Sequence, residues 1–255
     1  MHHAARWTRG HAAAELRRQT PRMKVSLVLL PGLDGSGSLF QPLLRELPSE
    51  LQRVVVSYPA QEFLGYPALK ELVLRSVPAD QPFFLLGESF SGPVAVLAAA
   101  ERPKGLLGVI LCASFVSPPR PWAALALPLL GLIPIRAAAR ALGQHMLVGR
   151  FKKPELAALM LAALAKVPEQ VLRLRLGAAA RVDVSAALRS LNCPSLYLQA
   201  SEDLVVPKDA ADVFSRVSRH GNVEVVAGPH FLLQCVPSDA AKSIMRFIER
   251  SQRGV

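Results

Sequence analysis

From Lys24 onward, short apolar runs alternate with amphipathic stretches, and this alternation constrains the fold more than any other feature of the chain. The apolar runs are near-continuous Val, Ile and Leu, as in strands that are covered on both faces. We predict strands at Val25–Leu30, Arg53–Tyr58, Pro82–Leu86, Leu106–Ala113, Ser195–Ala200 and Val223–Ala227. Helices are predicted at Leu39–Leu47, Pro67–Val77, Phe90–Ala100, Lys208–Ser218 and Ser238–Arg250. Such alternation favours an α/β fold with a doubly wound, mainly parallel sheet, in which ligands bind at the carboxyl ends of the strands.

One connection between the predicted strands is far longer than the others. About eighty residues separate the strand that ends near Ala113 from the strand that starts near Ser195, which exceeds an ordinary connection. This insert, at 117–190, enters before the penultimate strand and contains two helical patterns, Pro154–Lys166 and Glu169–Ala180. A mobile helical lid over the strand ends and a helical extension with no gating role both fit this pattern.

A serine lies where one predicted strand runs directly into a helix. The segment Phe83–Gly92 ends an apolar strand with a turn of the form small-x-Ser-x-small, with Gly87 and Ser91 as the small residues. A turn of this kind is sharp, and it exposes the serine hydroxyl beside the backbone N–H of the next residue. The pattern therefore predicts Ser89 as a nucleophile, with the N–H of Phe90 beside it.

A serine hydroxyl needs a base within hydrogen-bond reach, and His230 is the best candidate of the six histidines. It follows the last predicted strand in a Gly-Pro loop, at the edge of the sheet where Ser89 also emerges. The other histidines lie in the N-terminal segment, in the insert or at a predicted helix end: His2, His3, His11, His145 and His220.

The imidazole in turn needs a carboxylate that fixes its tautomer. Asp203 comes directly after a predicted strand and just before a helix, and Glu202 is its nearest competitor. Asp183 and Asp209 are expected to be solvated charges. The predicted catalytic residues are therefore Ser89, Asp203 and His230, in the order nucleophile, acid, histidine.

The turn after the first predicted strand, Pro31–Gly35, reads Pro-Gly-Leu-Asp-Gly and opens a helix. Its backbone N–H groups can face a developing negative charge, so we predict the N–H groups of Leu33 and Phe90 as oxyanion donors. Phosphate binding is disfavoured, because the turn has neither the lysine of a P-loop nor an intact GxGxxG pattern. Asp34 is expected to shape the turn and not to act as a second acid.

With these motifs, the run from Lys24 to Ser251 resembles an α/β-hydrolase of the small, lid-bearing serine esterase type. The PGLDG form is similar to bacterial hydrolases of uncharacterised substrate and to the hydrolase part of plant phytyl ester synthases. In size and lid, the chain more loosely resembles the esterase that cleaves the methyl ester of pimeloyl acyl carrier protein. Two residues depart from the usual pattern: Pro31 stands where many members have histidine, and Ser91 replaces a glycine.

The resemblance implies a serine hydrolase that cleaves a carboxylic ester through an acyl-enzyme intermediate, with no metal or organic cofactor. The alternatives are a thioesterase or esterase that acts on carrier-bound acyl groups, and a binding protein that kept the fold without the chemistry. The apolar stretch Trp122–Ile135 favours a hydrophobic small-molecule ester as substrate, although these residues equally fit packing of the insert onto the body.

The chain carries a formal net charge of +11, from 30 Lys and Arg against 19 Asp and Glu. An arginine-rich composition with a solvated basic face accounts for this, and so does an acidic partner such as an acyl carrier protein. The basic residues of the insert that would meet such a partner are Arg136, Arg140, Arg150, Lys152, Lys153, Arg173 and Arg175. Nucleic acid is not expected, because the basic residues do not alternate with aromatic ones.

The cysteines, the length of the apolar stretches and the N-terminal segment indicate where the protein is located and where its domain begins. The three cysteines are widely spaced without a CxxC pair, which favours a cytoplasmic protein. No apolar stretch reaches the length of about 20 residues that spans a bilayer. Residues 1–22 are expected to be a disordered tail or a segment upstream of the true start at Met23, outside a hydrolase domain at 23–255.

Overall fold

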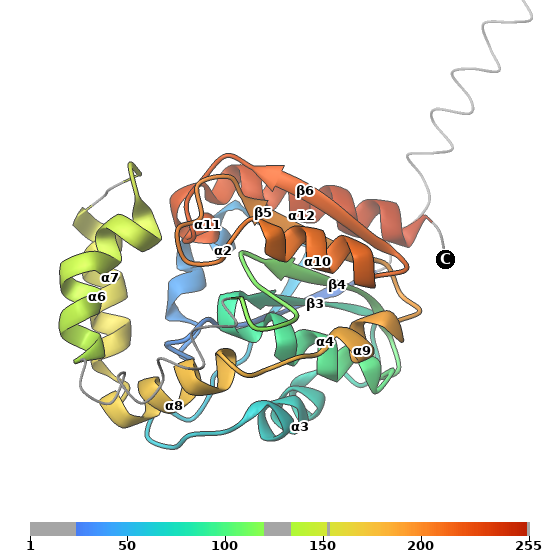
Figure 1. The fold of residues 1–255 in the computed structure, drawn as a ribbon. Coiled ribbons are helices and arrows are strands. Elements are labelled where there is room, and N and C mark those ends of the chain that lie inside the picture. Colours follow the sequence, from blue (N-terminus) through green and yellow to red (C-terminus); the bar gives the residue numbers. More distant parts are fainter. Residues whose placement is uncertain (1–23, 120–133, 152–153, 254–255) are drawn as a thin grey trace, which may run out of the picture.

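The computed structural model describes residues 24–119, 134–151 and 154–253. Within these ranges one sheet of six strands forms the centre, in the order β2-β1-β3-β4-β5-β6, and all neighbouring strands are parallel (Figure 1). The strands are β1 (Ser26–Leu30), β2 (Gln52–Val55), β3 (Phe83–Glu88), β4 (Leu106–Cys112), β5 (Ser195–Ala200) and β6 (Gly221–Val226). They overlap all six predicted strands, and the predicted α/β class is confirmed.

Both faces of the sheet are covered by helices, which explains why its inner strands β1, β3, β4 and β5 are mostly apolar and buried. In β1, Leu27 and Leu29 join the core on one face, whereas Val28 and Leu30 join the core on the other. One face packs against α3 (Tyr66–Ser76), α4 (Gly92–Ala100), α9 (Ser185–Arg189) and α10 (Asp209–Val217). The opposite face packs against α2 (Gln41–Glu46), α11 (Leu232–Cys235) and α12 (Pro237–Gln252). The sheet is doubly wound, as predicted.

The insert lies between β4 and β5, before the penultimate strand. The described residues 134–180 of the insert form α6 (Ile135–Gly143), a short π-helical turn η3 (Gln144–Val148), α7 (Pro154–Ala165) and α8 (Glu169–Ala179). Figure 1 shows α6 and α7 side by side at one end of the molecule, with α8 running back toward the body. The segment that contains these helices leaves and rejoins the body at one place, where the N–H of Val184 donates a hydrogen bond of 2.8 Å to the carbonyl of Val116.

Several short elements escaped prediction. Helices α9 and α11 have only five and four residues, too few for a sequence pattern to identify them, and packing against the sheet stabilises them. In the insert, α7 and α8 were predicted and α6 was not. The tail 1–22, most of the apolar stretch 122–135, and the pair Lys152 and Lys153 lie outside the described residues.

Two further expectations concern the cysteines and the membrane. All three cysteines are free, and Cys112 is buried in the sheet. In the parts of the chain that the structure describes, no helix has both the length and the apolar character to cross a bilayer.

Candidate active site

Ser89 lies in the sharp turn between β3 and α4, as predicted. Its backbone φ is 48°, in the left-handed region that residues with side chains rarely adopt. The turn is so tight that a Cβ on Gly87 would collide with the carbonyl of Ser91, and a Cβ on Gly92 would collide with the Ser114 hydroxyl. Glycine is therefore required on both sides of Ser89, because the chain folds back on itself there.

Ser91 occupies the position where the family pattern has glycine, and its hydroxyl has two hydrogen-bond partners. It donates a hydrogen bond to the carbonyl of Pro31 and lies 2.6 Å from the hydroxyl of Tyr58. Both Ser91 and Tyr58 are buried. Ser91 is small enough for the turn, and it also ties the turn to the PGLDG loop.

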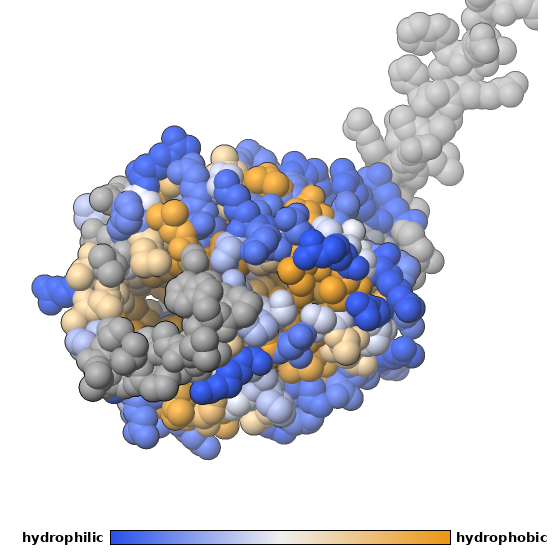
Figure 2. Space-filling model, viewed as in Figure 1, coloured by the Kyte–Doolittle hydropathy of each residue, from blue (hydrophilic) through white to orange (hydrophobic). Residues whose placement is uncertain are grey.

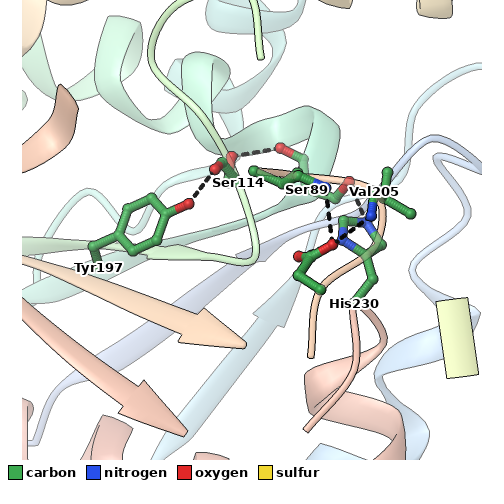
Figure 3. Close-up of polar contacts among 7 residues, drawn as sticks. Ser89, Ser114, Tyr197, Val205 and His230 are labelled. Atoms are coloured by element: carbon green, nitrogen blue, oxygen red, sulfur yellow. Dashed lines mark hydrogen bonds and ion pairs between the residues drawn. The ribbon is translucent and has the colours of Figure 1, made fainter. Parts of the chain in front are cut away.

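The three predicted catalytic side chains lie in one chain of hydrogen bonds (Figure 3). Ser89 Oγ is 2.9 Å from His230 Nε2, and His230 Nδ1 is 2.8 Å from Asp203 Oδ2. The other carboxylate oxygen, Asp203 Oδ1, accepts hydrogen bonds of 2.8 Å from the N–H groups of Val205 and Val206. The loops after β3, β5 and β6 thus bring together residues that are far apart in the sequence.

The neighbouring carboxylate, Glu202, points elsewhere. Its Oε1 lies 2.7 Å from Arg150 Nη2 in the insert, where both side chains are exposed. His230 and Asp203, in contrast, are 4% and 5% exposed. Of the two acids left open by the sequence, Asp203 is the one that contacts the imidazole.

Two residues that sequence reasoning missed, Ser114 and Tyr197, stabilise the serine turn through hydrogen bonds. Ser114 Oγ donates a hydrogen bond of 2.5 Å to the carbonyl of Ser89, and the hydroxyl of Tyr197 donates to the carbonyl of Ser114 (Figure 3). Ser114 follows β4 and Tyr197 lies within β5. No local pattern marks either residue, because both act only through neighbours that the sheet brings close.

The PGLDG loop passes directly over Ser89. A Cβ added to Gly32 would lie 4.0 Å from the Cβ of Ser89. The predicted oxyanion donors, Leu33 and Phe90, line the same cavity as Ser89. Asp34 accepts a hydrogen bond of 2.9 Å from the N–H of Ser36, which fits the predicted role in shaping the turn.

A largely apolar cavity of about 240 Å³ opens in front of Ser89 and His230. The body contributes Leu39, Phe115, Val205, Val206 and Phe231, and the insert contributes Ile135, Ala139, Leu147, Met160, Leu164, Leu176 and Ala179. In Figure 2, apolar surface gathers over the insert helices at the end of the molecule where α6 and α7 lie. Apolar side chains of the insert therefore form much of the wall next to Ser89.

Glu88, directly before Ser89, is a second buried carboxyl group at the cavity. Its Oε1 accepts a hydrogen bond of 2.8 Å from Gln234 Nε2, in α11. The pKa of Glu88 is raised to about 7, mainly by burial; the hydrogen bond from Gln234 and the charge of His230 oppose this shift, and the negative charge of Asp34 adds to it. The signal available in the sequence was a charged residue at the end of an apolar strand.

Arg175 corrects one of our expectations about the insert. We counted it among basic residues available to an acidic partner, but it is only 1% exposed and donates hydrogen bonds to two backbone carbonyls of the body.

Among the described residues, no group of three or more His, Cys, Asp or Glu side chains is arranged to hold a metal ion.

Comparison with solved structures finds the same fold in several known enzymes. A thermophilic esterase from Thermogutta terrifontis aligns with a TM-score of 0.72 at 20% identity, over 91% of this chain and 91% of that chain. Esterase RhEst1 from Rhodococcus sp. ECU1013 aligns with a TM-score of 0.71 at 20% identity, over 89% and 90%. A bromoperoxidase from Bacillus anthracis aligns with a TM-score of 0.75 at 14% identity, over 89% and 92%. Identities this low demonstrate a shared fold alone.

Sequence comparison identifies the family. No curated protein sequence matches the chain. The model of the alpha/beta hydrolase family, however, matches residues 27–241, which contain the serine turn, the PGLDG loop and both Asp203 and His230. The chain therefore belongs to the alpha/beta hydrolase family.

Proposed function

We propose that the protein is a serine esterase that hydrolyses a carboxylic ester through an acyl-enzyme intermediate. The observation that carries this proposal is the hydrogen-bonded chain of Ser89, His230 and Asp203 at the wall of an apolar cavity. In this arrangement a hydroxyl nucleophile has a base at 2.9 Å, and the base has an orienting carboxylate at 2.8 Å.

In the acylation step, Ser89 Oγ attacks the ester carbonyl while its proton moves to His230 Nε2. Asp203 stabilises the imidazolium that forms and keeps Nδ1 as a donor. The negative charge on the carbonyl oxygen is stabilised by the N–H groups of Leu33 and Phe90; such a donor typically contributes about 3 kcal/mol. The tetrahedral intermediate then collapses, His230 protonates the leaving alkoxide, and an alcohol departs.

Deacylation repeats these steps with water. His230 removes a proton from a water molecule, whose oxygen attacks the acyl carbonyl of the Ser89 ester. Collapse of the second tetrahedral intermediate releases the carboxylic acid and returns the proton to Ser89. Each proton that leaves an oxygen in this cycle passes through His230.

The cavity favours a hydrophobic acyl or alcohol group on the substrate. Its wall is mainly aliphatic, with Leu164, Leu176 and Met160 among the residues supplied by the insert. A polar chain of similar length would lose hydrogen bonds to water there without replacing them. Since α6, α7 and α8 all contribute to this wall, we propose that the insert acts as a lid that shapes the acyl site.

The test is a pair of serine variants assayed with p-nitrophenyl esters. Ser89→Ala should lower kcat by at least about a thousandfold, because no other group can form the acyl-enzyme. Ser190→Ala is the matched control, since its exposed hydroxyl, among the described residues, bonds only to the carbonyl of Ala187, away from the cavity. A fluorophosphonate probe should label wild type at Ser89. Full activity of Ser89→Ala would show that Ser89 is not the nucleophile. A wild type with neither the label nor ester hydrolysis would instead identify a binding protein that kept the fold.

A further inference from the structure

Arg175, on insert helix α8, is a buried cation close to the proposed active site. Its guanidinium donates through Nη1 to the carbonyl of Leu33, at 2.8 Å, and through Nη2 to the carbonyl of Pro59, at 2.9 Å. With 1% exposure, it is the largest of the fully buried side chains. Arginine is almost never buried to this degree unless it is paired.

The partners of this guanidinium are neutral. Within the described ranges, no carboxylate oxygen lies within 4.0 Å of it. Burial lowers the pKa of Arg175, and the negative charge of Asp34 opposes this shift. The Asp34 carboxylate is nevertheless more than 4.0 Å away, too far for an ion pair. Desolvation of a cation for two carbonyl partners is costly, so the arrangement suggests a use beyond stability.

The guanidinium also packs against the PGLDG loop at Gly35. A Cβ on Gly35 would lie 2.7 Å from Nη1 of Arg175 and 3.1 Å from Cζ. The φ of Gly35 is +71°, a conformation that favours glycine in any case. The second glycine of PGLDG is thus required both by the turn and by the close approach of Arg175.

Alternate carbonyls of the loop are each held by a different part of the protein. The Ser91 hydroxyl donates to the carbonyl of Pro31, Arg175 donates to that of Leu33, and the N–H of Tyr58 donates to that of Gly35, at 2.7 Å. Fixing the carbonyls on either side restricts rotation of the peptide between them, and that peptide carries the N–H of Leu33. Two of these three donors belong to the body, and the third comes from the insert.

The side chain of Leu33 is held by the insert as well. It packs against an apolar cluster that includes Val167, Val171 and Leu172, of which the last two lie on α8. Leu176, next to Arg175 on the same helix, lines the cavity. Helix α8 therefore contacts both the carbonyl and the side chain of Leu33, and it also forms part of the wall of the cavity.

We propose that Arg175 is a positioning residue for the oxyanion donor Leu33, so that insert helix α8 sets the geometry of the reacting centre as well as covering it. This inference rests on the proposed esterase function. It predicts that loss of the guanidinium weakens binding of the transition state while binding of the uncharged substrate is unchanged.

The test compares three variants with wild type on a p-nitrophenyl ester. Arg175→Met keeps the length of the side chain and removes both donors. Arg175→Lys keeps the charge but has one ammonium, which cannot reach both carbonyls. Arg181→Met is the control, because Arg181 is exposed and bonds only within its own segment, to the carbonyl of Gly177 at 3.2 Å.

Two inhibitors separate a positioning role from a merely structural one. A trifluoromethyl ketone forms a tetrahedral oxyanion adduct with the serine, whereas the corresponding secondary alcohol fills the cavity without an adduct. For Arg175→Met we expect kcat to fall about 10- to 100-fold, with KM changed less than about threefold. The inhibition constant of the ketone should rise in step with the loss of kcat/KM, and that of the alcohol should stay unchanged. Arg175→Lys should lie between Arg175→Met and wild type.

Melting curves of each variant show whether it is folded under the assay conditions. The proposal is overturned if a folded Arg175 variant keeps the wild-type kcat, or if the affinities for ketone and alcohol fall together. It is also overturned if neither variant folds, because Arg175 would then be needed for the fold itself. If wild type shows no ester hydrolysis that depends on Ser89, the proposed function fails first and independently of Arg175.

Discussion

Glu88 places a second carboxyl group beside Ser89, and this group makes stability depend on pH. Its pKa is raised from an ordinary 4.5 to about 7 in the folded protein, mainly by burial. The folded state thus holds the proton more tightly than the unfolded chain does. This contribution to stability is fully present below pH 4.5 and is lost as the pH rises through about 7.

The prediction is that Glu88→Gln flattens the pH dependence of unfolding. Wild type should lose on the order of 3 kcal/mol between about pH 5 and about pH 8 through this group, and the variant should not. Denaturant unfolding at both pH values measures the difference. Glu50→Gln, at an exposed position, is the control and should follow wild type. A Glu88→Gln protein with an unchanged pH dependence would show that Glu88 does not titrate in this range.

Asp203 and Glu202 are adjacent acids with different partners, which allows a direct test of the proposed triad. Asp203→Asn should lower kcat by about 10³- to 10⁴-fold, because the amide no longer holds His230 in the productive tautomer. Glu202→Gln loses only the exposed contact with Arg150 and should stay within about threefold of wild type. Steady-state assays of the two variants decide between the acids. Equal losses would point to general damage to the loop after β5.

At the scale of single elements, the insert helices should determine the length of the acyl chain. Ala139 on α6 lines the cavity, whereas Ala141 on the same helix is exposed. We predict that Ala139→Leu reduces kcat/KM for long-chain p-nitrophenyl esters at least about tenfold relative to the short-chain ones, because the larger side chain fills the site. Ala141→Leu should keep the wild-type profile. The same profile for both variants would place the acyl chain outside this cavity.

The sequence predicted those elements whose hydrophobic pattern is local. All six strands were predicted: the four inner ones are mostly apolar because both of their faces are covered, and the edge strands β2 and β6 contain several valines. Ser89 and His230 were placed at strand ends by their flanking residues. Helix α9 and the roles of Ser114 and Tyr197 could not be predicted, because they depend on contacts between segments that are distant in the sequence. The role of Arg175 was missed for the same reason: its partners precede it by more than a hundred residues.

Across the whole molecule, the net charge of +11 offers less to an acidic partner than the sequence suggested. Within the described part of the insert, Arg175 is buried and Arg150 is paired with Glu202. Arg136 donates to the carbonyl of Val167, and both Arg136 and Arg140 are exposed. An acyl carrier protein as partner stays a prediction, as does a cytoplasmic location.

A salt titration distinguishes free from carrier-bound substrates. Hydrolysis of a free p-nitrophenyl ester should change less than about twofold between about 50 mM and about 300 mM NaCl, because the cavity wall is apolar. With the same acyl group on an acyl carrier protein, KM should rise steeply with salt only if the basic surface binds the carrier. Arg140→Glu then serves as a check, since it should weaken binding of the carrier and leave hydrolysis of the free ester unaltered.

The hydrogen bond between Val184 and Val116 has a consequence for exchange of the insert between related scaffolds. Because the nitrogen of Val184 lies 2.8 Å from the carbonyl oxygen of Val116, another insert whose ends are equally close can replace the segment between these two residues without displacing β4 or β5. Such a chimera would acquire a new acyl wall together with the foreign helices. It would also lose the Arg175 guanidinium that packs against the PGLDG loop. For the chimera to be active, the new insert therefore has to supply another donor to the Leu33 carbonyl.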